Sequence, residues 1–482
     1  MEVAMEEDMF TVHFPHSFPA FDDEMSWEDQ SIVMDCFPFF GDDVSVLCGG
    51  GSTSSLVGGN SSPDVIFSTE TSIKLPPAEE QSSGKVLDTG RGHGYRGPLL
   101  LQLLILAAEA LAGKHKSREL ARVVLIRLQE LAIISSASTI ERLAVYFADA
   151  LQSLLDGTGK GSAFGRPSAY DELVALHLIQ DMTPFANFGH LTATQAILEA
   201  VAGERRVHIV DFDVAEGLHW ASLMQALVSN RKGSPPISLR ITAVVGSGRG
   251  RVSTEKMEET GRRLVLFAAS FGLSVNFGLC RLDRNKKFRP EAVKLLKGEA
   301  LVFNCCLYPP HLSRHAAASV KSFLAGASVL GARVVTIVKE ERSGSGGTGF
   351  VGNFLQEFER YWAMMEAMED EFREQGRARE TVERAILSPS IEAAVRKAYC
   401  EEVDDDDEGM EDWMAASGFR RVQISGFNAC QARLLLGLFN HGYGVEEEGI
   451  NKLVLRWKTR RLFSAAVWST TPSPAVGSLT SV

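Results

Sequence analysis

Cysteine is scarce in this 482-residue chain: seven are present, and no two of them form a Cys-x-x-Cys pair. An odd number of cysteines without such pairs indicates free thiols in a reducing compartment rather than a disulfide framework. Cys305 and Cys306 are adjacent within an apolar run, which favours buried strand residues over a metal or redox site. We therefore predict no metal centre.

Long hydrophobic runs are also missing. The longest, Leu99–Ala112, is interrupted by Gln102 and Glu109, and it is shorter than the ~20 residues that a membrane-spanning helix needs. The acidic N-terminus does not resemble a secretory signal. We therefore expect a soluble intracellular protein with no membrane partner.

Basic residues are absent from the first 43 positions. This segment carries twelve acidic groups: Glu2, Glu6, Glu7, Asp8, Asp22, Asp23, Glu24, Glu28, Asp29, Asp35, Asp42 and Asp43. The other 49 acidic groups of the chain balance its 49 basic ones. Bulk charge therefore gives no reason to expect strong non-specific binding of nucleic acid.

The acidic segment also contains aromatic side chains, and residues 44–92 that follow it are rich in glycine and serine. A self-repelling chain with few apolar groups stays solvated, so residues 1–97 are predicted to be disordered, as is the tail at 470–482. Interleaved acids and aromatics are typical of activation segments. We favour this interpretation of residues 1–43 over an inert solubilising tail, which would need no aromatic rings.

Residues 98–203 show helical periodicity and are predicted to form a helical cap. Leu120, Val124 and Leu128 recur behind a Ser117 cap, and Ser138 and Glu141 form a capping box before a second apolar stripe. Two stretches fit Leu-x-x-Leu-Leu, the spacing of a helix that enters a partner's groove. The candidate partner-binding residues are Leu100, Leu103, Leu104, Leu120, Val124, Leu128, Leu151, Leu154 and Leu155. Apolar helices match Leu-x-x-Leu-Leu often, so core packing is the favoured explanation for the leucines of both stretches.

Residues 204–469 alternate between apolar strands and helices. Strands are predicted at 207–212, 239–245, 273–277, 301–305 and 333–338, followed by a hairpin of 452–457 and 462–468. Such alternation implies an α/β fold with a doubly wound parallel sheet. Residues 204–469 are therefore predicted to form the α/β core.

The first strand and its following loop, residues 207–217, occupy the place where such a sheet binds a nucleotide or S-adenosylmethionine. That chemistry requires glycines for close approach of the backbone to the ligand. Here Phe212, Asp213 and Glu216 precede a single glycine, Gly217. We expect the ring and the carboxylates to fill the cofactor space, with Asp211 and Asp213 capping or fixing the loop. No cofactor is predicted.

No catalytic set can be assembled from the sequence: Gly-x-Ser-x-Gly and His-Glu-x-x-His are both missing. A glycine-rich basic loop at 246–251 could bind phosphate, but a solvated flexible loop is the favoured explanation. A basic cluster at 281–289 could also bind phosphate, and a solvated face explains it equally well. The candidate nucleic-acid contacts are Arg249, Arg251, Lys286 and Lys287.

Several ordered landmarks carry a family resemblance. The first strand reads Val207-His208-Ile209-Val210-Asp211, a later helix reads Phe358-Glu359-Arg360-Tyr361-Trp362, and tryptophans follow at Trp413, Trp457 and Trp468. These resemble the VHIID, PFYRE and SAW regions of the plant GRAS family of transcriptional regulators, and leucine-rich helices would lie at about 99–200 and 255–297. Within the family, stretches such as Asp181–Phe185 and Leu434–Asn440 are most similar to the branch of root-nodule symbiosis signalling.

The resemblance implies a methyltransferase-like, Rossmann-type sheet with an N-terminal helical cap. It also implies a non-enzymatic nuclear regulator that pairs with another GRAS protein through the cap and acts on symbiosis (nodulation and mycorrhiza) and strigolactone-related genes. Promoter DNA, contacted directly or through the partner, and a second copy of the chain are further expected partners. The alternative is a small-molecule-binding or methyltransferase-type enzyme that uses the mouth of the sheet.

Overall fold

The computed structural model describes residues 93–470, except for 113–115, 134–137, 158–166, 213, 215, 230–237, 247–250, 308–316, 342–348 and 401–408. The acidic segment, the glycine- and serine-rich stretch to residue 92 and the tail from 471 lie outside the described residues, so the disorder predicted there stays a prediction. The first helix, α2 (His93–Ala112), begins before the predicted boundary at residue 98. Pro98, which suggested a helix start, lies inside this helix.

Five parallel strands form the centre of the molecule in the order β3-β2-β1-β4-β5. They are β1 (Arg206–Phe212), β2 (Ser238–Val245), β3 (Ser274–Arg281), β4 (Ala300–Leu307) and β5 (Val334–Glu340). The strands predicted from apolar runs are thus confirmed, and so is the doubly wound α/β class. The order reverses on either side of β1, which creates a topological switch point between β1 and β4.

Antiparallel strands extend the sheet beyond β5. The predicted hairpin is confirmed as β8 (Lys452–Trp457) and β9 (Arg460–Thr470), with β9 paired to β5. Two short strands were not predicted: β6 (Phe419–Arg421) pairs with β9, and β7 (Tyr443–Glu448) pairs with β8. Both are short, and β7 ends in three glutamates, so neither carries a hydrophobic run.

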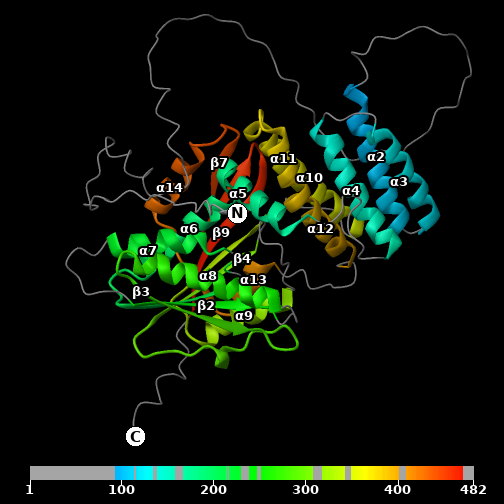
Figure 1. Ribbon diagram of the computed structural model, residues 1–482. Helices are drawn as coiled ribbons and strands as arrows, with labels where there is room; N and C mark the ends of the chain where they lie inside the picture. The colour runs from blue at the N-terminus through cyan, green and yellow to red at the C-terminus, as the bar shows by residue number, and fades with distance from the viewer. Residues whose placement is uncertain are drawn as a thin grey trace, which may run out of the picture.

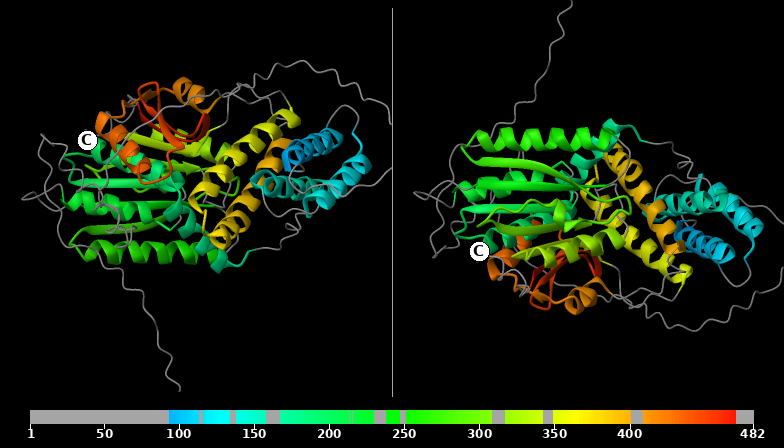
Figure 2. Two further views of the ribbon diagram at one scale, coloured as in Figure 1. Left: turned by 90° about the horizontal axis from the view of Figure 1, so that it is seen from above. Right: turned by 90° about the horizontal axis from the view of Figure 1, so that it is seen from below.

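Helices cover both faces of the sheet (Figure 2). Val207 and Ile209 pack toward α7 (Leu218–Ser229), α8 (Arg251–Ala269) and the end of α6 (Pro184–Ala200). Val210 and Phe212 point to the opposite face and pack with α9 (Ala317–Val329) and α13 (Met410–Ala416). Strand β1 is mostly apolar because both of its faces are buried, and its polar residues His208 and Asp211 are buried with the apolar ones.

The helical cap is built from two distant parts of the chain. Helix α4 (Thr139–Asp156) packs against α10 (Phe350–Glu371) and α12 (Ser388–Cys400), and α2 packs against α4 and α10 (Figure 1). Helix α3 (Arg118–Ile133) packs against α2 and α4. Helix α6 instead lies on β5 and β9 of the sheet, and α5 (Ala169–Met182) contacts α11 (Gly376–Val382). The predicted layer 98–203 is therefore divided between cap and core, because α6 is apolar enough to be buried on the sheet.

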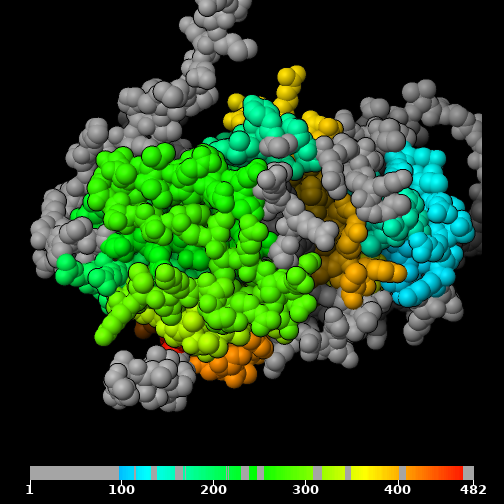
Figure 3. All heavy atoms as spheres, turned by 60° about the horizontal axis from the view of Figure 1, so that its bottom comes forward, coloured from blue at the N-terminus to red at the C-terminus, as the bar shows by residue number. Residues whose placement is uncertain are grey.

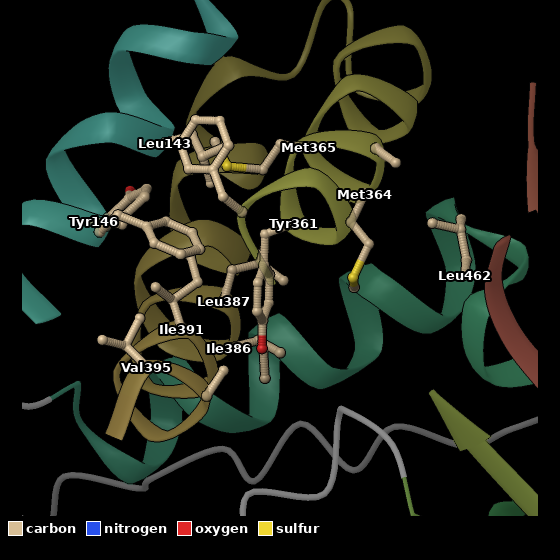
Figure 4. Close-up of a cluster of buried hydrophobic side chains, with 14 of the residues drawn as sticks. Leu143, Tyr146, Tyr361, Met364, Met365, Ile386, Leu387, Ile391, Val395 and Leu462 are labelled. Atoms are coloured by element: carbon tan, nitrogen blue, oxygen red, sulfur yellow. The ribbon is translucent and has the colours of Figure 1, made fainter. Parts of the chain in front are cut away.

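Local signals explain how the cap helices begin. Ser138 accepts a hydrogen bond from the backbone of Glu141, whose side chain returns to the Ser138 backbone, so the predicted capping box is confirmed. The backbone N–H of Leu120 donates to the Ser117 hydroxyl. The apolar face of α4 then meets α10, the π-helical turn η3 (Glu383–Leu387) and α12 in one cluster that includes Tyr146, Tyr361 and Met365 (Figure 4).

A buried ion network fastens the cap to the C-terminal helices. Arg142 of α4 lies 3.2 Å from Glu383 of η3 and also contacts Glu369 of α10. The Tyr146 hydroxyl donates to Glu383 at 3.3 Å. Burial raises the pKa of Tyr146, and the neighbouring Glu383 raises it further. These contacts hold the inner side of α4 in place and leave the outer side of α2 and α3 to solvent.

The second leucine-rich region departs from its expected form. Helices were predicted over about 255–297, and α8 ends at Ala269. After β3, residues 282–299 form what we call the connector, whose only helical piece is the 3-10 turn η2 (Pro290–Ala292). Its leucines lack a helix because basic residues, a proline and polar turns separate them. The last helix, α14 (Gly426–Leu436), packs on α6.

Candidate functional site

The mouth of the sheet, where β1 and β4 end, is the place at which a Rossmann-type sheet binds its cofactor. Asp211 of β1 and Asn304 of β4 are register partners there. One carboxylate oxygen of Asp211 accepts from Asn304 Nδ2 at 2.8 Å, and the other accepts from Trp220 Nε1 at 2.8 Å. All three side chains are buried. The Asp211 carboxylate therefore holds α7, the helix that follows β1, in place.

Further side chains complete this network. Asn304 Oδ1 accepts from the Thr336 hydroxyl at 2.7 Å. His219 lies with Nε2 3.5 Å from Asp211 Oδ2, and its ring stacks on His190 of α6 with centroids 4.4 Å apart. The chain's own indole, imidazole and amide groups therefore fill the switch point.

The loop between β1 and α7 is drawn toward α8. Val214 is buried, and Glu216 pairs with Lys256 and Arg263 of α8 at 2.8 and 2.7 Å. Burial opposes the charge of Glu216, but the hydrogen bonds from Lys256 and Arg263 outweigh it and hold its pKa below the ordinary value. Gly217 has φ +73°, and a Cβ there would lie 3.0 Å from Leu264. The described residues of this loop are thus packed against the core and α8.

The predicted filling of the mouth needs correction in its details. The Phe212 ring points to the other face of the sheet, 4.8 Å from the Phe323 ring, and Glu216 turns to α8. Asp213 lies outside the described residues. Asp211 has the predicted loop-fixing role, whereas Trp220, Asn304 and His219 were missed. The tryptophan two residues after Leu218 was the available signal, since a buried indole N–H needs an acceptor.

His208 forms a second polar cluster, on the face opposite Asp211. Arg240 donates to His208 Nδ1 at 3.0 Å, so Nε2 carries the proton and donates to the Thr242 hydroxyl at 2.8 Å. Glu299 of the connector lies 3.6 Å from Nδ1 and pairs with Arg240. Burial lowers the pKa of His208 to about 4, Arg240 lowers it as well, and Glu299 opposes both.

This low pKa predicts a pH-dependent stability. The unfolded chain takes up the His208 proton below about pH 6.5, whereas the folded protein resists it until about pH 4. The stabilisation by neutral His208 is therefore fully present above pH 6.5. Between pH 6.5 and 4, its contribution to the free energy of unfolding falls by roughly 3 kcal/mol. We expect urea unfolding of the wild type to show this extra loss relative to His208→Asn; parallel pH curves for the two proteins would contradict it.

The nine candidate partner-binding residues of the cap differ in how far they are exposed. Leu100, Leu104, Val124, Leu128, Leu151 and Leu155 are buried, while Leu103 and Leu154 are partly buried. Their helical spacing faces the cap's own core, so the prediction that they contact a partner is corrected for the buried six. Of the nine, Leu120 is the one classed as exposed, at 45%.

An exposed apolar surface nevertheless exists on the cap, formed by neighbouring residues. On α3, Val123 is 63% and Ile126 50% exposed, next to Leu120. On α2, Leu99 and Leu106 are about as exposed as Leu120. We call these five residues the outer cap face. Of these five residues, Leu120 was predicted to contact a partner. The other four were not, because apolar residues that recur at helical spacing usually mark the packed side of a helix.

The remaining predicted residues are distributed as follows. Trp457 and Trp468 are buried. Arg249 lies outside the described residues, and Arg251 begins α8 without a described side chain. Lys286 and Lys287 are exposed on the connector just beyond β3. Because β2 and β3 are parallel neighbours, the segment that follows β2 and the start of the connector share one edge of the sheet.

Metal and membrane sites were sought among the residues that the structure describes. In these ranges no group of three or more histidine, cysteine, aspartate and glutamate side chains is arranged to hold a metal ion. No described helix combines the length and the apolar character needed to cross a bilayer.

Comparison with known proteins places this geometry in context. Residues 100–469 match the sequence model of the GRAS domain family. The chain is 49% identical over 386 residues to Protein NODULATION SIGNALING PATHWAY 2 of Lotus japonicus, covering 78% of this chain and 77% of the relative. It is 47% identical over 400 residues to the protein of that name from Medicago truncatula, covering 79% and 78%.

A solved structure agrees with both the fold and the family. The crystal structure of SCL7 in Oryza sativa aligns with a TM-score of 0.61 and 28% identity, covering 77% of this chain and 99% of that one. The resemblance stated from the motifs, including the likeness to a nodulation-signalling member, is confirmed by these relatives.

Proposed function

Because the chain belongs to the GRAS domain family, we propose that it is a plant transcriptional regulator in nodulation signalling that works by pairing with another GRAS protein and catalyses no reaction. The names of the two relatives support the pathway. The observation that carries the pairing is the outer cap face, an apolar surface on helices whose opposite side is already packed in the core.

The composition of α2 strengthens this argument. An amphipathic helix normally turns polar residues to solvent, as α2 does with Gln102 and Glu109. Helix α2 buries Leu100 and Leu104 against the cap core but exposes Leu99 and Leu106. The exposed side of α3 lies beside it, and the two helices sit at the end of the molecule away from the sheet (Figure 3). A partner helix pair would remove this apolar surface from water.

The pairing can be tested with charged substitutions on the outer cap face. Val123→Glu combined with Ile126→Glu is expected to weaken the complex with a partner GRAS protein at least tenfold, which corresponds to about 1.4 kcal/mol, because two carboxylates would be buried without counter-charges. Isothermal titration calorimetry measures the affinity, and light scattering gives the stoichiometry.

A matched control comes from the α/β core. Leu266 of α8 is 72% exposed and lies outside the cap. Leu266→Glu should leave the affinity unchanged. Equal affinity of the cap variant and this control, with both proteins folded by circular dichroism, would place the interface elsewhere. Self-association of the wild type alone would identify a second copy as the partner.

The finer assignments belong to the same proposal. The partner is a protein like the nodulation-signalling pathway 1 protein, and the target genes are those of root symbiosis and strigolactone production. The complex acts in the nucleus, where residues 1–43, acidic and aromatic, recruit the transcription machinery. Promoter DNA is contacted directly or through the partner. Deleting residues 1–43 should lower reporter activation while partner binding persists.

The occupied mouth of the sheet supports a role without S-adenosylmethionine. Trp220, Asn304 and His219 lie where an adenosyl group would have to enter, and displacing them would break the Asp211 network. Titration with S-adenosylmethionine is therefore expected to leave the melting temperature unchanged. A ligand at 100 times its dissociation constant stabilises by about 2.7 kcal/mol, so a saturable upward shift would favour the methyltransferase alternative instead.

A further inference from the structure

The connector is the most basic surface segment of the described structure. Its residues 282–299 hold six basic and three acidic side chains: Arg284, Lys286, Lys287, Arg289, Lys294 and Lys297 against Asp283, Glu291 and Glu299. The chain beyond residue 43 as a whole is balanced in charge, with 49 acidic and 49 basic groups. This concentration of positive charge on one segment therefore calls for a negatively charged occupant.

The backbone of the connector is held in place by hydrogen bonds and packing, whereas the charged groups at the ends of most of its basic side chains are not. Asp283 accepts from the backbone N–H groups of Asn285 and Lys287 at 2.8 and 2.9 Å. The Lys297 carbonyl accepts from Arg206 at 3.1 Å. Phe288 is buried against Gly326 of α9, where a Cβ would lie 2.5 Å from its ring. The connector is thus a rigid strip across the core.

The basic side chains of this strip are largely unused by the fold. Arg289 pairs with Asp283. Arg284, Lys286, Lys287, Lys294 and Lys297 are exposed, and none of the five makes an ion pair with another residue that the structure describes. Five free cations on a fixed backbone form a surface that a flexible polyanion can meet without reorganising it.

Apolar side chains lie among these cations. Leu295 and Leu296, between Lys294 and Lys297, are 43% and 51% exposed. A nucleic-acid backbone would use the ammonium groups and leave the leucines in water. A peptide that carries both carboxylates and aromatic rings would use both kinds of group. The mixed character of the strip therefore favours an acidic-aromatic peptide over DNA.

We propose that the acidic-aromatic segment of this same chain, residues 1–43, docks on the connector and shields its lysines from nucleic acid. The segment supplies twelve carboxylates, no basic group, and the aromatic side chains Phe10, Phe14, Phe18, Phe21, Trp27, Phe37, Phe39 and Phe40. This contact goes beyond the proposed function and needs no partner protein. It competes with recruitment, because a docked segment cannot meet the transcription machinery.

Chain length permits the contact within one molecule. Residues 44–92 link the acidic segment to α2 and are rich in glycine and serine. Such a tether has a root-mean-square span of about 40 Å and a full reach of roughly 160 Å, compared with a radius of gyration near 21 Å for a domain of this size. A tether in this range gives an effective concentration on the order of millimolar, so weak electrostatic contacts suffice.

Zero-length carbodiimide cross-linking of the full chain tests the docking directly. Carboxylates of residues 1–43 should link to Lys286, Lys287, Lys294 and Lys297 about fivefold more often than to Lys116, which is also exposed and lies in the cap. At roughly 0.5 M salt the links should become fewer, because salt screens the attraction between exposed charges. Mixing ¹⁴N- and ¹⁵N-labelled protein distinguishes links within one chain from links between chains.

The shielding has its own test, with random-sequence 20-base-pair DNA as the probe. Replacing Asp22, Asp23, Glu24, Glu28 and Asp29 by their amides should raise DNA affinity about fivefold at low salt. The additional change of the four connector lysines to glutamine should abolish that gain. No enrichment of connector cross-links over Lys116, or links only between differently labelled chains, would overturn the proposal. An unchanged DNA affinity would overturn the shielding.

Discussion

Arg360→Ala is expected to lower the free energy of unfolding by about 3–5 kcal/mol, which makes it one of the two most damaging single changes that we predict. Arg360 of α10 is buried, 2.8 Å from Glu340 at the end of β5 and bonded to Glu357 on its own helix. Burial opposes its charge, but the two carboxylates hold its pKa above the ordinary value. Its removal takes this buried guanidinium away from both carboxylates.

Chemical denaturation measures this effect, and the chain offers a matched control. Arg127 of α3 forms an exposed pair with Glu130, and Arg127→Ala should cost less than about 0.5 kcal/mol. Arg360→Met combined with Glu340→Gln and Glu357→Leu should recover much of the loss, because the uncompensated charges are removed as well. A cost for Arg360→Ala no larger than that of Arg127→Ala would contradict the role assigned to this ion network.

Trp468→Ala should destabilise the protein by a similar amount, about 3–5 kcal/mol. Trp468 of β9 is 1% exposed and packs in the cluster of Phe303 and Phe323, opposite Val335 in the register with β5. The Arg421 guanidinium lies 5.8 Å from its ring. Alanine would leave a cavity where the antiparallel half of the sheet joins the parallel half.

Two further variants distinguish packing from a general loss of aromatic side chains. Trp468→Phe keeps most of the volume and should cost roughly 1–2 kcal/mol. Trp413→Ala removes a partly buried indole at the edge of the same cluster and should cost clearly less than Trp468→Ala. Urea midpoints give the comparison. If Trp413→Ala and Trp468→Ala were equally damaging, burial of Trp468 would not be the reason for its effect.

These residues show why the family motifs are informative about the fold. Asp211 of the VHIID-like strand fixes Trp220 and Asn304, and His208 ties β1 to β2 and the connector. Arg360 joins the cap-packing helix α10 to the sheet. The motifs therefore hold the scaffold together, whereas the surfaces that we propose for partners and for residues 1–43 lie on segments between them.

The sequence by itself determined the class of the fold. Apolar runs that alternate with helical stripes predicted the parallel strands, since a strand buried on both faces is mostly apolar. The capping box at Ser138 and Glu141 and the hairpin of β8 and β9 depend on neighbours in the chain, so they could also be predicted. That the loop after β1 has a single glycine, where a cofactor loop needs several, could also be seen in the sequence.

Only the tertiary structure decided which side of each element faces solvent and which distant groups meet. Leu104 and Leu106 have the same chemistry and differ by two positions, yet one is buried against α4 and α10 and the other belongs to the outer cap face. The pairing of Asp211 with Asn304, and of Arg360 with Glu340, joins residues from different strands and helices. Periodicity records local geometry, whereas burial and ion pairing depend on the packing of elements far apart in the sequence.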